Sequence, residues 1–180
     1  MNKLIVPLIV TVIGLNLSSC DPEKTFITPV YTQSIKNDSD QEIKWFRYSL
    51  KVFNDQEGGE LVSKVDTTIV NPNTKKLGVY KGQYFPIPEV GEEESDFIER
   101  SISRFNHYPY SIDIPIFKLY VGDKLIKEWT GPSGSFGDTI NSPYNYDSWE
   151  VVKYDEAVQI EGWEVIHGEL VFTISNEDLN

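Results

Sequence analysis

Alternation of polar and apolar side chains along residues 43–53 constrains the fold of this chain more than any other feature. The segment reads IKWFRYSLKVF, and its apolar face carries Phe46, Tyr48, Leu50 and Val52, with Lys44 as the main exception. The other face carries Arg47, Ser49 and Lys51. A period of two is typical of a half-buried β-strand. Aromatic residues make up 13% of the chain, and flat rings fit a pleated, half-buried surface.

Other segments of the chain carry strand signals and are separated by turn-rich loops. We expect strands over 30–35, 43–53, 61–70, 77–80, 110–121, 124–129, 149–154 and 164–175. Residues 84–88 contain two prolines and cannot form a central strand. Gly122-Asp123 is a hairpin signature. Strands at intervals of roughly 8–12 residues favour a sandwich or barrel. We therefore predict an all-β fold, a single antiparallel β-sandwich.

One segment follows a helical pattern instead. A single face at helical spacing would carry Phe97, Ile98, Ser101, Ile102 and Phe105. Acidic residues lie just before this segment, and two arginines lie in its second half. Negative charge near the start of a helix and positive charge near its end both interact favourably with the helix dipole. The pattern predicts one short helix over 96–105, with an inserted loop as the alternative.

The first twenty residues read as an export signal. Lys3 gives a positive start, and residues 4–15 form an almost unbroken apolar run. A membrane span needs about 20 apolar residues, so this run is short for a span but suits the core of a secretory signal. The run ends at Leu15, and Cys20, the single cysteine of the chain, follows after a short segment that contains Ser18 and Ser19.

Leu17-Ser18-Ser19-Cys20 resembles a bacterial lipobox, with an aliphatic residue, two small residues and a cysteine in order. The resemblance implies that the signal is cut between Ser19 and Cys20 and that Cys20 is lipidated. The chain then divides into a signal peptide (1–19), a lipidated N-terminus and tether (20–30) and a β-sandwich domain (31–180). The alternative is a buried, inert cysteine in a signal-anchor helix.

The layout is similar to that of small acidic lipoproteins of Bacteroidales-type bacteria, many of unknown function. The likeness includes Ser148-Trp149 near the end of the chain and the closing segment 172–179, FTISNEDL. Domains of this group are often immunoglobulin-like, so the likeness implies an immunoglobulin-like sandwich. It also implies an anchor in the outer membrane, with the domain exposed at the cell surface, and it brings no catalytic residues. Asp21 and Glu23 after the cysteine fit that location, although Asp at the position after the cysteine favours inner-membrane retention in other groups.

Candidate chemistry is sparse. The net charge of −12 and the lack of a basic cluster argue against nucleic-acid binding. His107 and His167 lack further ligands at metal-binding spacing, so we expect neither a metal nor a cofactor. Asp38, Asp40 and Glu42 lack the glycine of a calcium loop, which favours a solvated turn. GPSGSFG (131–137) matches neither a hydrolase elbow nor a phosphate loop.

Four aromatic residues gather around the loop over residues 131–148: Trp129, Tyr144, Tyr146 and Trp149. Such rings stack on sugars or form contact hot spots when exposed, and otherwise pack the edge of a sandwich. We expect a lipid-anchored, non-enzymatic binding or structural module with a membrane, glycan or envelope-protein partner. The alternatives are a carbohydrate-binding accessory protein that uses these rings, and an envelope hydrolase that uses His107 or His167.

Overall fold

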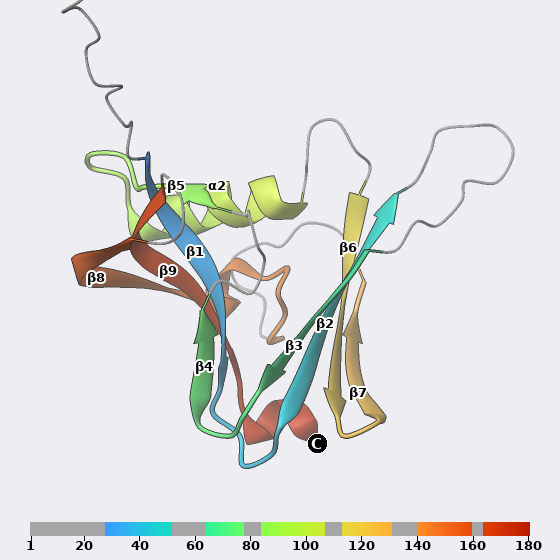
Figure 1. Ribbon diagram of the computed structural model, residues 1–180. Coiled ribbons are helices and arrows are strands. Elements are labelled where there is room, and N and C mark those ends of the chain that lie inside the picture. Colours follow the sequence, from blue (N-terminus) through green and yellow to red (C-terminus); the bar gives the residue numbers. More distant parts are fainter. Residues whose placement is uncertain (1–27, 52–63, 78–83, 107–112, 131–139, 160–163) are drawn as a thin grey trace, which may run out of the picture.

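Two β-sheets packed face to face make up most of the structure (Figure 1). The structure is a computed structural model that describes residues 28–51, 64–77, 84–106, 113–130, 140–159 and 164–180. The predicted all-β sandwich is confirmed, while the immunoglobulin-like topology stays a prediction. The expected loop over 131–137 and His107 lie outside the described residues.

Sheet A has the order β4-β1-β9-β8. Its strands are β1 (Thr28–Asn37), β4 (Thr74–Leu77), β8 (Trp149–Gln159) and β9 (Glu164–Ile174), and the short β5 (Phe85–Pro86) pairs with the start of β1. β1 and β9 run parallel, whereas the other described pairings are antiparallel. The first and last strands of the sandwich therefore lie side by side at the centre of one sheet.

Sheet B has the order β3-β2-β6-β7 and is antiparallel throughout. Its strands are β2 (Ile43–Lys51), β3 (Lys64–Val70), β6 (Asp113–Val121) and β7 (Lys124–Trp129). The predicted hairpin between β6 and β7 is confirmed, because Val121 pairs with Lys124 across a two-residue turn. Gly122 in that turn has φ +59°, a conformation that glycine adopts without steric cost.

Aromatic side chains join the two sheets. Trp45 of β2 is 1% exposed and lies 5.4 Å from the Phe117 ring, 5.3 Å from Trp129 and 5.5 Å from Phe172 of β9. Trp149 of β8 lies 5.3 Å from the same Phe172 ring. Each ring pair at such a separation contributes about 0.5–1.5 kcal/mol in addition to the free energy of burying its apolar area. This aromatic cluster therefore stabilises the packing of the two sheets.

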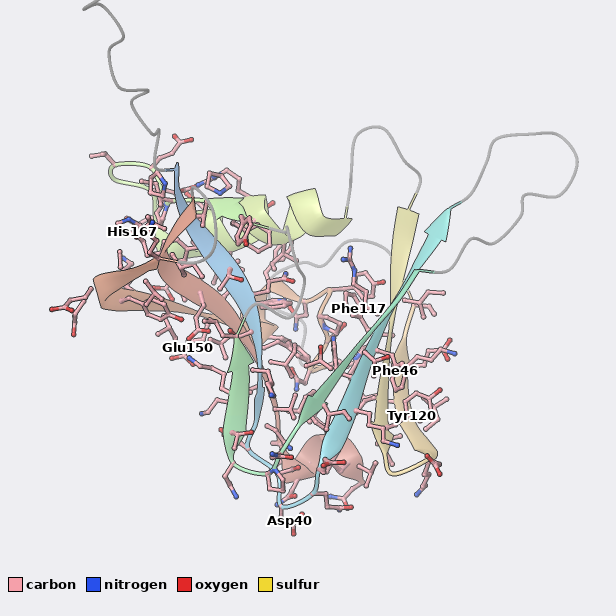
Figure 2. All side chains as sticks on the ribbon, in the orientation of Figure 1. Asp40, Phe46, Phe117, Tyr120, Glu150 and His167 are labelled. Carbon is pink, nitrogen blue, oxygen red and sulfur yellow. The ribbon has the colours of Figure 1, made fainter. Side chains whose placement is uncertain are left out.

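The buried face of β2 is the opposite of the apolar face seen in the sequence. Ile43, Trp45 and Arg47 are buried, while Phe46 points outward and is half-buried. The Phe46 ring makes an edge contact with Tyr120 of β6 at 4.9 Å (Figure 2). The register explains this, because Trp45 pairs with Leu119, which is fully buried. Both faces of the strand carry aromatic residues, so the alternation shows the period but not the inner side.

The predicted helix is confirmed as α2 (Glu94–Asn106), and the inserted-loop alternative is wrong. Phe97, Ile98, Ser101 and Ile102 form its buried face. Arg100 holds the preceding turn in place through two 2.7 Å hydrogen bonds from its guanidinium to the carboxylate of Glu92. α2 lies across one end of the sandwich, and the short helix η2 (Asn176–Leu179) lies at the other (Figure 1).

The expected strand boundaries shift by a few residues. β1 extends beyond 30–35 in both directions and begins before the expected domain boundary at residue 31. β4 begins at Thr74, earlier than the expected 77, because the turn at Asn71–Asn73 is compact, with φ +54° at Asn73. β8 continues to Gln159, past the expected end at residue 154.

Candidate functional site

The four aromatic residues expected to form a binding platform are buried. Trp129, Tyr144, Tyr146 and Trp149 are only 5–6% exposed. The indole N–H of Trp129 donates to the carbonyl of Asn141 at 3.0 Å, and that of Trp149 donates to the carbonyl of Pro143 at 3.2 Å. These rings attach the segment over residues 140–148 to the core, so they offer no stacking surface for a sugar.

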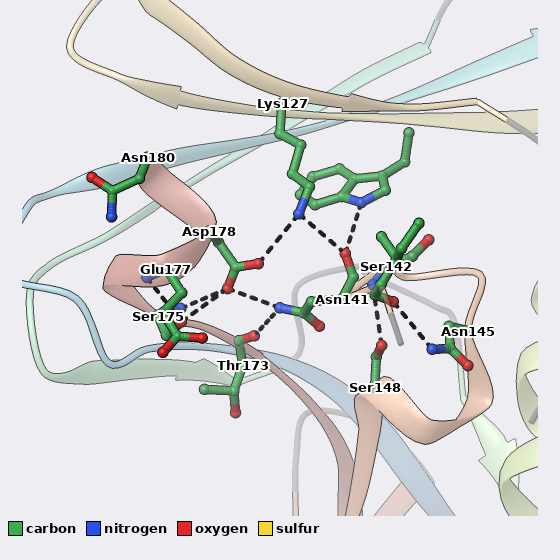
Figure 3. Close-up of polar contacts among 12 residues, drawn as sticks. Lys127, Asn141, Ser142, Asn145, Ser148, Thr173, Ser175, Glu177, Asp178 and Asn180 are labelled. Carbon is green, nitrogen blue, oxygen red and sulfur yellow. Dashed lines mark hydrogen bonds and ion pairs between the residues drawn. The ribbon is translucent and has the colours of Figure 1, made fainter. Parts of the chain in front are cut away.

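The same segment is fastened to the C-terminal end of the chain by a polar cluster centred on Asp178 (Figure 3). Asn141 Nδ2 donates to Asp178 Oδ2 at 2.9 Å, and Lys127 Nζ lies 3.3 Å from Asp178 Oδ1. The backbone N–H of Ser175 also donates to Asp178 Oδ2, at 2.9 Å. Asp178 therefore ties β7, the 140–148 segment and η2 together, which is a structural role.

The other candidate residues do not form a site among the described residues. His167 is exposed on β9 (Figure 2). Asp38 forms an ion pair with Lys36 at 2.7 Å, and the adjoining turn is closed by Asn37 Oδ1, which accepts from the N–H of Ser39 at 3.0 Å. No group of three or more potential metal ligands occurs in the part of the chain that the structure describes. No described helix has the length and apolarity needed to cross a membrane.

A hollow on the outer face of sheet A does collect polar and charged groups. Its volume is about 280 Å³, and it is lined by residues of β1, β4, β8, β9 and the turn before β4: Lys36, Asn73, Thr74, Lys75, Glu150, Val152 and Val171. Glu150 lies on the side of the molecule away from sheet B (Figure 2). We refer to this feature as the sheet A hollow.

The two lysines of the sheet A hollow face each other across the β1–β4 pair. Lys36 and Lys75 are register partners, so their side chains lie on the same face. The pKa of Lys36 is raised, chiefly by its hydrogen bond to Asp38. Burial acts in the opposite direction, and the negative charges of Asp38 and Glu150 raise the pKa further. The pKa of Lys75 is lowered, chiefly by burial. The negative charge of Glu150 raises this pKa, and the positive charge of Lys36 lowers it further. Both ammonium groups therefore lie within electrostatic range of Glu150.

A fully buried carboxylate lies beside the hollow. Glu169 of β9 is 0% exposed, and it accepts hydrogen bonds from Lys75 Nζ and Ser34 Oγ. A buried charge is stable only when it is paired and hydrogen-bonded, and these two donors meet that need. Glu169 fixes the position of the Lys75 side chain at the wall of the hollow.

Sequence reasoning missed this arrangement because its members come from distant parts of the chain. Lys36 and Lys75 look like ordinary surface lysines, and only the register of β1 with β4 and β9 brings them near Glu150 and Glu169. The one available signal was Glu169 itself, which breaks the apolar run of the last strand. Chemically, the lining of the hollow combines lysine ammonium groups, the Glu150 carboxylate and the apolar side chains of Val152 and Val171.

Comparisons with known proteins add no assignment: no family model matches the chain, and no similar curated protein or solved structure was found.

Proposed function

We propose that this protein is a lipid-anchored component of the bacterial cell envelope, whose sandwich domain is a non-enzymatic binding or structural module. The anchor is a lipid on Cys20, placed in the outer membrane with the domain facing the cell surface. The observation that carries the proposal is the segment Leu17-Ser18-Ser19-Cys20 at the end of an apolar run. Lipid chains contribute about 0.8 kcal/mol per buried CH₂, so two or more chains hold a protein stably.

The position of the first strand limits how far the domain can lie from a lipid on Cys20. β1 begins at Thr28, shortly after Cys20. A chain as long as residues 21–27 reaches about 25 Å at most, even when fully extended. A lipid on Cys20 would therefore hold the sandwich close to the membrane surface.

A binding or structural role is also supported by how the polar residues of the domain are used. Asp178, Asn141 and Asn37 are engaged in hydrogen bonds that fasten loops and strand ends. The glycan-binding alternative that depended on exposed aromatic rings is not proposed, because those rings are buried. No observation favours the hydrolase alternative, since His167 is exposed on β9 and His107 lies outside the described residues.

The experiment is to express the full chain and its Cys20→Ala variant in a Gram-negative host that processes lipoproteins. We expect the wild type to incorporate a fatty-acid label, to sediment with the outer membrane, and to have the mass of a chain beginning at lipidated Cys20. Cys20→Ala should lose the label and leave the membrane fraction or retain its signal. Pro22→Ala, which changes the tether but not the cysteine, should behave as the wild type.

Equal labelling and equal distribution of the wild type and Cys20→Ala would overturn the anchor. Surface exposure is tested separately, by adding a protease to intact cells. Degradation of the wild type without cell lysis is expected, and complete protection would overturn the surface location.

A further inference from the structure

The first strand runs the length of the sandwich, from the end covered by α2 to the end that carries η2 (Figure 1). Near its start, Val30 and Tyr31 pair with β5, and the Tyr31 ring lies 5.1 Å from the Phe97 ring of α2. Just after its last residue, the backbone N–H of Asp38 donates to the carbonyl of Ile174 at 2.8 Å, next to η2. The chain therefore enters the domain at the α2 end.

The domain is longer than the segment that would tether it to a lipid. β1 has 10 residues, and a strand rises about 3.3 Å per residue, so the two ends of the sandwich lie about 33 Å apart. The chain over residues 21–27 reaches about 25 Å at most, even when fully extended. If the η2 end faced the membrane, Thr28 would lie a full strand length above it, beyond the reach of this tether. A lipid on Cys20 therefore excludes the inverted arrangement.

The chemistry of the α2 end indicates that it faces lipid headgroups across water and does not insert among them. Glu93, Glu94 and Asp96 are exposed at the start of α2. Val90 in the preceding loop is fully exposed, but one valine buries too little apolar area to hold a domain of this charge in a bilayer. Carboxylates are repelled by anionic headgroups within about 8 Å at physiological salt. The tether, and not insertion, therefore sets the orientation.

We propose that the tether holds the α2 end of the sandwich toward the membrane and that the η2 end points away from it. The η2 end consists of the turns that join β1 to β2, β3 to β4 and β6 to β7, together with η2 itself (Figure 1). These turns are then the surface that a macromolecule meets when it approaches from the aqueous side. This inference rests on the proposed lipid at Cys20.

The test measures fluorescence energy transfer from each end of the domain to the bilayer. The full chain is produced with its lipid and placed in phosphatidylcholine vesicles that contain a trace of acceptor-labelled lipid. Lipidation occupies Cys20, the single cysteine, so an introduced cysteine takes one donor dye. Val90→Cys labels the α2 end and Asp40→Cys labels the opposite end (Figure 2), and both positions are exposed. We expect transfer from position 90 to be several times faster, because transfer falls steeply with distance.

Two controls separate the effect of the tether from that of the labelled position. Glu93→Cys is a second exposed position at the α2 end, so its dye should give transfer similar to that from position 90. A tether that carries residues 21–27 twice reaches about 50 Å, which exceeds the length of the domain. This longer tether should reduce the difference in transfer between positions 90 and 40.

Three outcomes would overturn the proposal. The first is equal transfer from positions 90 and 40, which would indicate that the domain lies on its side. The second is faster transfer from position 40, which would indicate the inverted arrangement. The third is an unchanged difference with the longer tether, which would show that tether length does not set the orientation. Fatty-acid labelling of the same samples reports the anchor separately, so failure of the anchor and failure of the orientation are distinguished.

Discussion

Gly168 of β9 lies where the protein has no room for a side chain. A Cβ placed there would lie 2.4 Å from Cε1 of Tyr31, 2.4 Å from the carbonyl oxygen of Val152 and 2.7 Å from Cζ of Tyr31. Ordinary van der Waals contact begins near 3.4 Å. The Tyr31 ring cannot simply swing aside, because it is buried and packs at 5.1 Å in an edge arrangement with the Phe97 ring of α2. The Val152 oxygen belongs to the β8 backbone and is equally constrained.

We expect Gly168→Ala to destabilise the protein by about 2 kcal/mol. Inserting an atom into a packed site costs about 1–3 kcal/mol, occasionally more. The loss of glycine's freedom in the unfolded chain returns about 0.4–1 kcal/mol, so the steric term dominates. For a domain of this size, each kcal/mol shifts the melting temperature by about 2–4 °C. The melting temperature should therefore fall by about 4–8 °C.

The measurement is urea unfolding followed by tryptophan fluorescence, with thermal melts by circular dichroism. Adding Tyr31→Leu to Gly168→Ala should give less than the sum of the single losses, because the ring is one of the clashing partners. Gly122→Ala is a control of a different kind. Gly122 has open space around it and φ +59°, so alanine costs about 1 kcal/mol there through the backbone alone. A change of less than about 0.5 kcal/mol for Gly168→Ala would refute the steric argument.

Three further predictions concern polar groups. Asp178→Asn replaces the carboxylate that accepts from Asn141 and Ser175 with an amide, and should lower the free energy of unfolding in urea by about 1–3 kcal/mol and alter Trp129 fluorescence. An unchanged urea midpoint would contradict the structural role of Asp178. The Arg100 hydrogen bonds lower the pKa of Glu92 from 4.5 to about 2, so the pair stabilises the fold above pH 4.5 and loses this effect as the pH falls toward 2. The melting temperatures of wild type and Glu92→Gln should therefore differ at pH 6 and converge at pH 2, and a constant difference would contradict this. Glu169→Ala removes the acceptor of Lys75 Nζ and of the fully buried Ser34 hydroxyl and should cost about 1–3 kcal/mol in urea; combining it with Lys75→Met should cost less than the sum of the two single losses, and strict additivity would argue against the ion pair.

The elements that the sequence predicted well are those specified by local chemistry. α2 was predicted because its apolar residues recur at helical spacing, and its buried face confirms that reading. The β6–β7 hairpin was predicted because Gly122-Asp123 occupies the turn that joins the strands. Local signals of this kind depend on a few neighbouring residues and need no knowledge of the rest of the fold.

The features that the sequence could not provide depend on which residues meet across strands. The inner face of β2 is set by the pairing of Trp45 with Leu119, and the outward Phe46 looks just as apolar in the sequence. The parallel pairing of β1 with β9 likewise leaves no local trace. The sheet A hollow follows from that register, so Lys36, Lys75 and Glu150, which line it, carry no signal of their own in the sequence.

The parallel pairing of β1 with β9 has a mechanical consequence. Any pull transmitted through residue 28 runs along β1, whose neighbours are β4 and β5 on one side and β9 on the other. If the opposing load acts at the chain's other end, beyond β9, it pulls the two strands past each other in opposite directions along their length. The hydrogen bonds between them then share the force together instead of opening one after another. Held by its first strand, this sandwich would resist drag in shear, the direction in which a β-ladder is hardest to part.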